Sequence, residues 1–150
     1  MRNDAVGYRP TMDPTRSWSF VSNAMADACT VRLAVRRFLE ASADCATSDL
    51  DAAELIVGEL IANVVRHGAP PFGVCVDWND EFPMLYVSDR GRPQRHLLYP
   101  APDRGAERGR GLLLVRALAA GEVVVDPPGD QHRGTRIAVA LPVRRGGCAA

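Results

Sequence analysis

Lysine is missing from this sequence of 150 residues, and all 18 of its basic residues are arginine. A nucleotide site of the P-loop kind uses a lysine for the phosphates, so the absence of lysine excludes that kind of site. The arginines are balanced by 18 acidic residues. The chain therefore has no overall positive charge for a general nucleic-acid-binding surface, and we expect no direct nucleic-acid partner.

Cysteine is scarce and widely spaced, at Cys29, Cys45, Cys75 and Cys148, with no Cys-x-x-Cys pair. A zinc site or a redox dithiol therefore has no support in the sequence. We expect reduced thiols, two or three of them buried. No apolar run reaches membrane-spanning length, and the first ten residues lack the apolar core of a signal peptide. These absences predict a cytoplasmic protein without a membrane anchor.

The chain reads as one domain at residues 17–142, between a loose lead-in at 1–16 and a loose tail at 143–150. Alternating apolar residues predict a strand at 17–21, and apolar residues at helical spacing predict a helix at about 24–41. Ser48-Asp49-Leu50-Asp51 has the form of a capping box, which predicts a second helix that runs from there to Gly68.

Alternation and turn residues predict a hairpin in the middle of the chain, formed by strands at 72–78 and 84–88. Residues 90–109 are rich in glycine and proline and indicate a functional lid. A helix is predicted at 110–120, with Leu113, Leu114, Ala117 and Leu118 as its inner face, followed by strands at 122–125 and 133–141. The order predicts an α+β sandwich with helices on one face of a mostly antiparallel sheet.

A polar stripe runs along the apolar helix between Ser48 and Gly68. Glu59, Asn63 and His67 are four residues apart, so they share one face of the helix. Asparagine is a modest helix former and needs a reason in the middle of an apolar helix. Its carboxamide oxygen suits Mg²⁺, and Glu59 is placed to take a proton from water or a hydroxyl group. A solvated helix face explains the stripe equally well.

A second polar motif, Asp89-Arg90-Gly91, ends the hairpin. A carboxylate at a strand end can accept a hydrogen bond from the amino group of adenine, and the glycine allows the backbone to approach the ring closely. In isolation an ordinary turn is the favoured explanation, because aspartate and glycine are common at strand ends.

A third motif, Arg108-Gly109-Arg110-Gly111-Leu112, opens the helix after the lid. Free N–H groups and the helix dipole favour phosphate there, and glycines let it come close. Between residues 90 and 110 the sequence has six arginines against two acidic residues, which strengthens the case for phosphate over a solvated basic loop.

A fourth motif, Gly134-Thr135, lies at the head of the last predicted strand. By itself it indicates only the end of a β-turn.

In chain order, Glu-x-x-x-Asn, Asp-x-Gly, a lid, Gly-x-Gly and Gly-Thr resemble the N, G1, G2 and G3 boxes of the GHKL ATPase superfamily. The phrases ELIANVVRHG, VSDRG, GRGLLLVRALA and GTRIAVALP look most like RsbW-type anti-sigma factors, which are serine kinases. The resemblance covers residues 17–142. It implies a Bergerat-type two-layer α+β sandwich, with a mixed, mostly antiparallel sheet and helices on one face.

The resemblance also implies a role for each matching residue. Asn63 would bind Mg²⁺ and the phosphates of ATP, and Glu59 would be the general base. Asp89 and Gly91 would hold adenine, with Thr135 reaching the same side through its hydroxyl group or a water molecule. The remaining contacts would come from Gly109, Arg110, Gly111 and Leu112 around the phosphates, Arg108 at the terminal phosphate, and His67 near the ribose or phosphates. Pro93 departs from the pattern, because many relatives have glycine there, and it stiffens the start of the lid.

The function that the resemblance implies is an ATP- and Mg²⁺-dependent serine kinase that also sequesters a sigma factor. Its substrate would be an anti-anti-sigma partner with a STAS domain. Dimerisation is usual among such relatives, so a homodimer is a further partner to consider. The alternative is a catalytically silent module that binds nucleotide and only sequesters its protein partner. A sensor histidine kinase is disfavoured because a second helical domain with a phosphoacceptor histidine is missing from the sequence.

Overall fold

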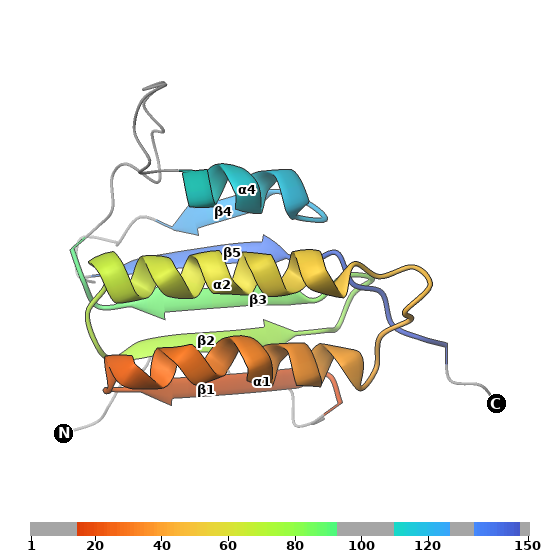
Figure 1. Ribbon diagram of the computed structural model, residues 1–150, viewed down its shortest axis with the longest axis horizontal. Coiled ribbons are helices and arrows are strands. Elements are labelled where there is room, and N and C mark those ends of the chain that lie inside the picture. The colour runs from red at the N-terminus through yellow and green to blue at the C-terminus, as the bar shows by residue number, and fades with distance from the viewer. Residues whose placement is uncertain (1–14, 93–109, 127–133, 148–150) are drawn as a thin grey trace.

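The computed structural model describes residues 15–92, 110–126 and 134–147, and these form an α+β fold of two layers. Figure 1 labels the strands and α-helices, and the elements in chain order are β1 (Ser17–Ser22), η1 (Met25–Asp27), α1 (Ala28–Glu40), α2 (Leu50–His67), β2 (Phe72–Asp77), β3 (Met84–Asp89), α4 (Arg110–Leu118), β4 (Val123–Asp126) and β5 (Thr135–Ala140). The predicted order of strands and helices is confirmed, with small differences at the element ends.

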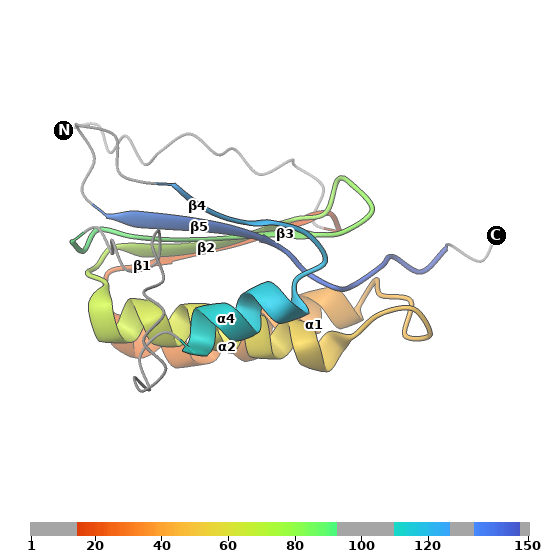
Figure 2. The ribbon, with the colours of Figure 1, turned by 90° about the horizontal axis from the view of Figure 1, so that it is seen from above.

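Within the described residues the sheet has five strands in the order β1-β2-β3-β5-β4. Each neighbouring pair is antiparallel, so this part of the chain contains none of the parallel pairs expected of a mixed sheet. Side chains alternate along the strands: Phe72, Val74 and Val76 of β2 are buried, whereas Gly73 and Cys75 between them are half-buried. The buried side faces the helices, which all lie on one face of the sheet (Figure 2).

The helices bury apolar stripes against that face of the sheet. Helix α2 lies between α1 and α4 (Figure 1) and contacts both. Fully burying a valine, leucine or isoleucine contributes about 1.5–3 kcal/mol each, so this layer contact is the main source of stability. The stripes are Val31, Val35 and Leu39 of α1, Ile56, Leu60 and Val64 of α2, and Leu112 and Val115 of α4.

The start of α2 differs by one residue from the predicted capping box. Asp49, not Ser48, is the N-cap, and its carboxylate accepts a hydrogen bond of 2.9 Å from the amide of Ala52. Ser48 instead binds the C-terminal segment, since its Oγ accepts a hydrogen bond of 2.8 Å from the amide of Arg144. The hydroxyl group of Ser48 is thus engaged with Arg144, and the neighbouring Asp49 caps the helix.

The inner face predicted for α4 is wrong at Leu113, Leu114 and Ala117, and only Leu118 of the four packs against the core. Leu113 and Leu114 are exposed, at 58% and 37% of their surface, whereas Leu112 and Val115 are buried. An unbroken run of apolar residues at 112–115 carries no periodic signal. Packing against α2 and the sheet therefore chose between two equally apolar stripes.

Two further expectations concern cysteines and the tail. Cys29 and Cys45 are exposed and Cys75 is half-buried, so the expected burial of two or three thiols does not hold for the described cysteines. Burial nevertheless raises the pKa of the Cys75 thiol to about 11. Residues 143–146, which the sequence assigns to a loose tail, contact the fold: Val143 is fully buried, Arg145 forms a β-bridge with Ala43, and the Gly146 amide donates to the Ser42 carbonyl at 2.8 Å.

Candidate nucleotide-binding site

The predicted site residues come from four segments, three of which meet at one end of the two layers. The C-terminal end of α2, the end of β3 and the start of β5 lie at the left of Figure 1, and the first turn of α4 lies beside the middle of α2. The loop between α1 and α2 and the loop between β2 and β3 lie at the other end. The antiparallel pairing of β3 with β5 produces this convergence, because one strand ends where its neighbour begins.

Helix α2 positions the first group of predicted residues. Glu59 and Asn63 are partly buried, and His67, the last residue of the helix, is exposed. Successive members of the stripe are about 6 Å apart along the helix axis. Gly68 follows as the C-cap, with its amide bonded to the Val64 carbonyl at 2.8 Å. The stripe therefore leads from the middle of α2 toward the end of β3.

Asp89 ends β3 on the side that faces the helices, and only 7% of its surface is exposed. Its Oδ1 accepts a hydrogen bond of 2.7 Å from the amide of Gly91. The amide of Arg90 donates to the Ala69 carbonyl at 2.9 Å, which ties the strand end to the exit of α2. Burial raises the pKa of the Asp89 carboxyl above its ordinary value, against a smaller lowering by the amides of Gly91 and Ala69.

Three glycines pack directly against Asp89. A Cβ on Gly68 would lie 2.9 Å from Asp89 Cγ, and one on Gly91 would lie 2.9 Å from its Oδ1. Gly134 has a φ of 122°, and a Cβ there would overlap the Asp89 carbonyl oxygen. Any larger residue at these positions would displace the carboxylate or the strand end. Gly68 and Gly91 therefore border the carboxylate closely, and Gly134 borders the backbone carbonyl of Asp89.

Thr135 is the direct partner of Asp89 in the register of β3 and β5. It is equally buried, with 7% of its surface exposed, and its Oγ1 has no hydrogen-bond partner among the described residues. Buried hydroxyl groups are normally paired, so an unpaired one beside a buried carboxylate needs an explanation. The pair offers an acceptor and a hydroxyl group side by side, which fits the amino group and ring nitrogen of adenine.

The first turn of α4 contributes Arg110, Gly111 and Leu112. Arg110 is exposed and Gly111 is half-buried, whereas the Leu112 side chain is buried in the core. Any contact of Leu112 with phosphate would therefore use its backbone amide. Glu59 packs against this turn, because a Cβ on Gly111 would overlap Glu59 Oε2. The general base expected from the sequence is thus brought to the predicted phosphate end.

Two predicted phosphate contacts, Arg108 and Gly109, lie outside the described residues, as does Pro93. Among the residues that the structure describes, Glu59, Asn63, Asp89 and Thr135 are at least partly buried and belong to the segments that converge at this end. From the sequence, Gly134 was interpreted only as part of a turn and Gly68 only as the end of a helix, so their contacts with Asp89 were missed. The useful signal would have been their position, because Gly68 directly follows α2 and Gly134 directly precedes β5.

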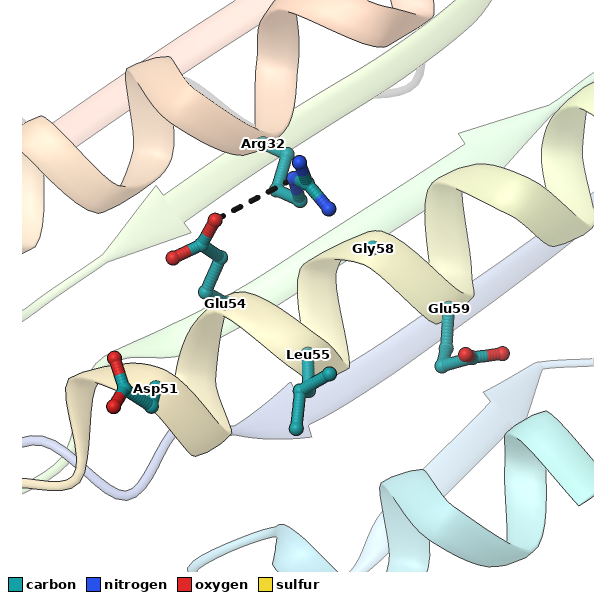
Figure 3. A pocket seen from close by; sticks show the side chains of 6 residues that line it. All are labelled: Arg32, Asp51, Glu54, Leu55, Gly58 and Glu59. Carbon is teal, nitrogen blue, oxygen red and sulfur yellow. Dashed lines mark ion pairs between the residues drawn. The ribbon is translucent and has the colours of Figure 1, made fainter.

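A groove of about 470 Å³ lies on the outer surface of the helix layer, next to Glu59. Figure 3 shows its lining side chains, with Glu54 directed toward Arg32 of α1 and joined to it by an ion pair of 3.5 Å. Glu59 lies at the other end of the groove, on the side of α2 that faces α4. The carboxylate is therefore accessible from the surface of the protein.

No group of three or more His, Cys, Asp or Glu residues that could hold a metal ion occurs in the described part of the chain. Mg²⁺ is commonly bound by one or two protein oxygens together with phosphates and water, so such a site needs no cluster of this kind.

The comparison with known families agrees with this geometry. The family model of the histidine kinase-like ATPase domain matches residues 21–137, and the chain belongs to this family. Membership implies ATP binding, and the two-layer sandwich with its antiparallel sheet is consistent with the GHKL fold. A search of curated proteins found no significant match. Among the described residues, no helix has the length and apolar character needed to cross a membrane.

Proposed function

We propose that the protein is an ATP- and Mg²⁺-dependent serine kinase of the RsbW type. Its substrate would be a STAS-type anti-anti-sigma protein, and it would also hold a sigma factor. The observation that carries the proposal is the contact of Glu59, in the middle of α2, with the first turn of α4, on a stripe that leads along α2 toward the buried pair of Asp89 and Thr135. The end with Asp89 and Thr135 suits the adenine ring, and the end with Glu59 suits a reacting phosphate.

Each residue has a definite task in this proposal. Asp89 would accept a hydrogen bond from the amino group of adenine, and the Thr135 hydroxyl, unpaired among the described residues, would complete its hydrogen bonding at the ring or through water. Asn63 would bind the metal through its carboxamide oxygen. The backbone amides of Gly111 and Leu112, together with Arg110, would hold phosphate oxygens at the start of α4.

Bound ATP with Mg²⁺ would supply the γ-phosphoryl group and the cation that offsets its charge. The protein then has to orient a serine hydroxyl and accept its proton. Glu59 is the acid-base group on the stripe that is both partly buried and adjacent to the phosphate end. A carboxylate at hydrogen-bond distance from the hydroxyl would act as the general base. Phosphorylation of the partner would add nearly two negative charges at the interface and weaken binding.

The nucleotide part of the proposal is tested by isothermal titration of ATP with and without Mg²⁺. We expect Mg²⁺ to strengthen ATP binding to the wild type, and Asn63→Ala to remove most of that gain. Asn79→Ala is the matched control, because Asn79 lies in the exposed turn between β2 and β3 at the opposite end. Equal affinities with and without Mg²⁺ in the wild type would contradict the role of Asn63.

The kinase part is tested with γ-labelled ATP and STAS-domain proteins from the same genome. Glu59→Gln should abolish transfer of label to the partner and leave ATP affinity nearly unchanged. Glu122→Gln, an exposed glutamate before β4, should transfer normally. If the wild type binds ATP and labels none of these partners, the protein is the silent nucleotide-binding module instead.

A further inference from the structure

The contact between Glu59 and Gly111 goes beyond what a phosphate-binding glycine requires. Glu59 leaves α2 on the side that faces α4 (Figure 3). A Cβ on Gly111 would overlap Glu59 Oε2, and it would also lie 3.4 Å from Glu59 Cδ and 3.9 Å from its Cβ. The whole carboxylate end of Glu59 thus borders the space that any other residue at position 111 would fill.

Neither helix is free to move apart to make room there. Leu112 and Val115 anchor α4 in the core immediately after Gly111, and Leu60 anchors α2 immediately after Glu59. Close-packed interiors resist shifts of this kind, so an added side chain would have to displace the glutamate instead. The position of the carboxylate is therefore set by what stands at position 111.

Charge favours the same placement. The first turn of α4 contains no acidic residue of its own, and the amide groups at the start of a helix have no partners within the helix. A carboxylate near this end interacts favourably with the helix dipole. Glu59 supplies that negative charge from the neighbouring helix.

We propose that Gly111 is a positioning residue for Glu59, and that its missing side chain is what lets the carboxylate rest against the first turn of α4. The catalytic consequence rests on the proposed function, in which Glu59 is the base, whereas the packing itself does not. The competing explanation is that Gly111 is glycine only to let a phosphate approach. The two differ in one respect: only positioning makes the effect of a side chain at 111 depend on Glu59.

Thermal unfolding without nucleotide distinguishes the positioning of Glu59 from the phosphate-approach explanation. Alanine is normally more stable than glycine in a helix, which for a chain of this size corresponds to a rise in Tm of about 2–4 °C. We expect Gly111→Ala to give less than this rise in the wild type and in Glu59→Gln, because both keep a side chain of the same length whose end has to move aside. In the Glu59→Ala background, Gly111→Ala should raise Tm by the full amount.

Gly58→Ala is the matched control, a glycine within α2 beside Glu59. A Cβ there would lie 3.4 Å from Arg32 Cδ, in a flexible side chain that can yield, so Gly58→Ala should raise Tm in all three backgrounds. The proposal is overturned if Gly111→Ala shifts Tm equally with and without the Glu59 side chain.

Phosphotransfer provides the readout that a purely structural role would not move. Gly111→Ala should lower kcat at least tenfold with little change in the KM for ATP. A rise in KM with kcat unchanged would favour phosphate approach and overturn the proposal. Because the unfolding experiment uses no nucleotide, an inactive wild type would refute the kinase function and leave the Tm comparison to decide the role of Gly111.

Discussion

Asp89 and Thr135 face each other across β3 and β5, both buried under the helix layer, and the hydroxyl group of the pair is unsatisfied within the described residues. A buried unpaired hydroxyl group costs free energy in the ligand-free protein. Such a cost is expected where a ligand later supplies the missing partner. The pair therefore makes separate predictions about stability and about nucleotide affinity.

Thr135→Val should separate these two effects. Valine has nearly the same shape but no hydroxyl group, so the ligand-free protein should be as stable as the wild type or up to about 1 kcal/mol more stable. ATP affinity should fall by about 1 kcal/mol, or about fivefold, through the lost hydrogen bond. Urea unfolding and calorimetric titration measure the two quantities. Thr30→Val, at an exposed position in α1, should leave ATP affinity unchanged.

Asp89 should make stability depend on pH with a defined sign. Its pKa in the folded protein is raised by burial, so between the ordinary value of 3.8 and the raised value the folded state holds more protons than the unfolded state. The free energy of unfolding contributed by this group therefore falls as pH rises through that interval, and stays constant above it. Asp89→Asn lacks this contribution.

Unfolding of wild type and Asp89→Asn should be compared from pH 3.5 to pH 7. We expect the variant to gain stability relative to the wild type as pH rises, and to lose ATP affinity at least tenfold, because an amide is a weaker acceptor than a carboxylate. Parallel stability curves would show that the carboxyl titrates normally in the folded protein.

Gly134→Ala should damage both the fold and the site. The φ of 122° is strained for any residue with a Cβ, and that atom would overlap the Asp89 carbonyl oxygen. Strain of this kind costs about 1–3 kcal/mol, and relief of the overlap would move Asp89. Gly147→Ala is the control, since no described atom lies within 4 Å of its added Cβ. Equal Tm values for the two variants would refute this account of Gly134.

Asp49→Ala should affect stability alone. Loss of the N-cap of α2 costs about 1 kcal/mol, because the amide of Ala52 loses its partner. The cap lies at the end of α2 away from Asp89, so ATP affinity should be unchanged when measured well below Tm. A large fall in affinity would mean that the two ends of α2 are coupled more tightly than a rigid helix implies.

The elements of this fold were predictable because their signals are local. Alternation identified β2 and β3, and apolar residues at helical spacing identified α1 and α2, in agreement with the structure. Where the local signal was degenerate the prediction failed. The apolar run from Leu112 to Val115 fits two faces of α4, and adjacent Ser48 and Asp49 both suit an N-cap.

The candidate site was predictable as a set of motifs and not as an arrangement. Glu59 and Asn63 follow from helix spacing, and Asp89 and Gly91 follow from a strand end. The contact of Gly111 with Glu59 joins residues more than 50 positions apart, and the Gly134 contact with Asp89 joins two strand ends. A dipeptide such as Gly134-Thr135 gains its meaning only when a neighbouring strand is known.

Spacing and residue type alone determined the order of strands and helices, and which chemical groups are available for a nucleotide and a base. Only the tertiary structure decided which face of α4 is buried, which residue caps α2, and that Glu59 rests against Gly111 while Asp89 lies opposite Thr135. The physical reason is that periodicity and capping act within a few residues, whereas packing and strand register compare alternatives across the whole chain.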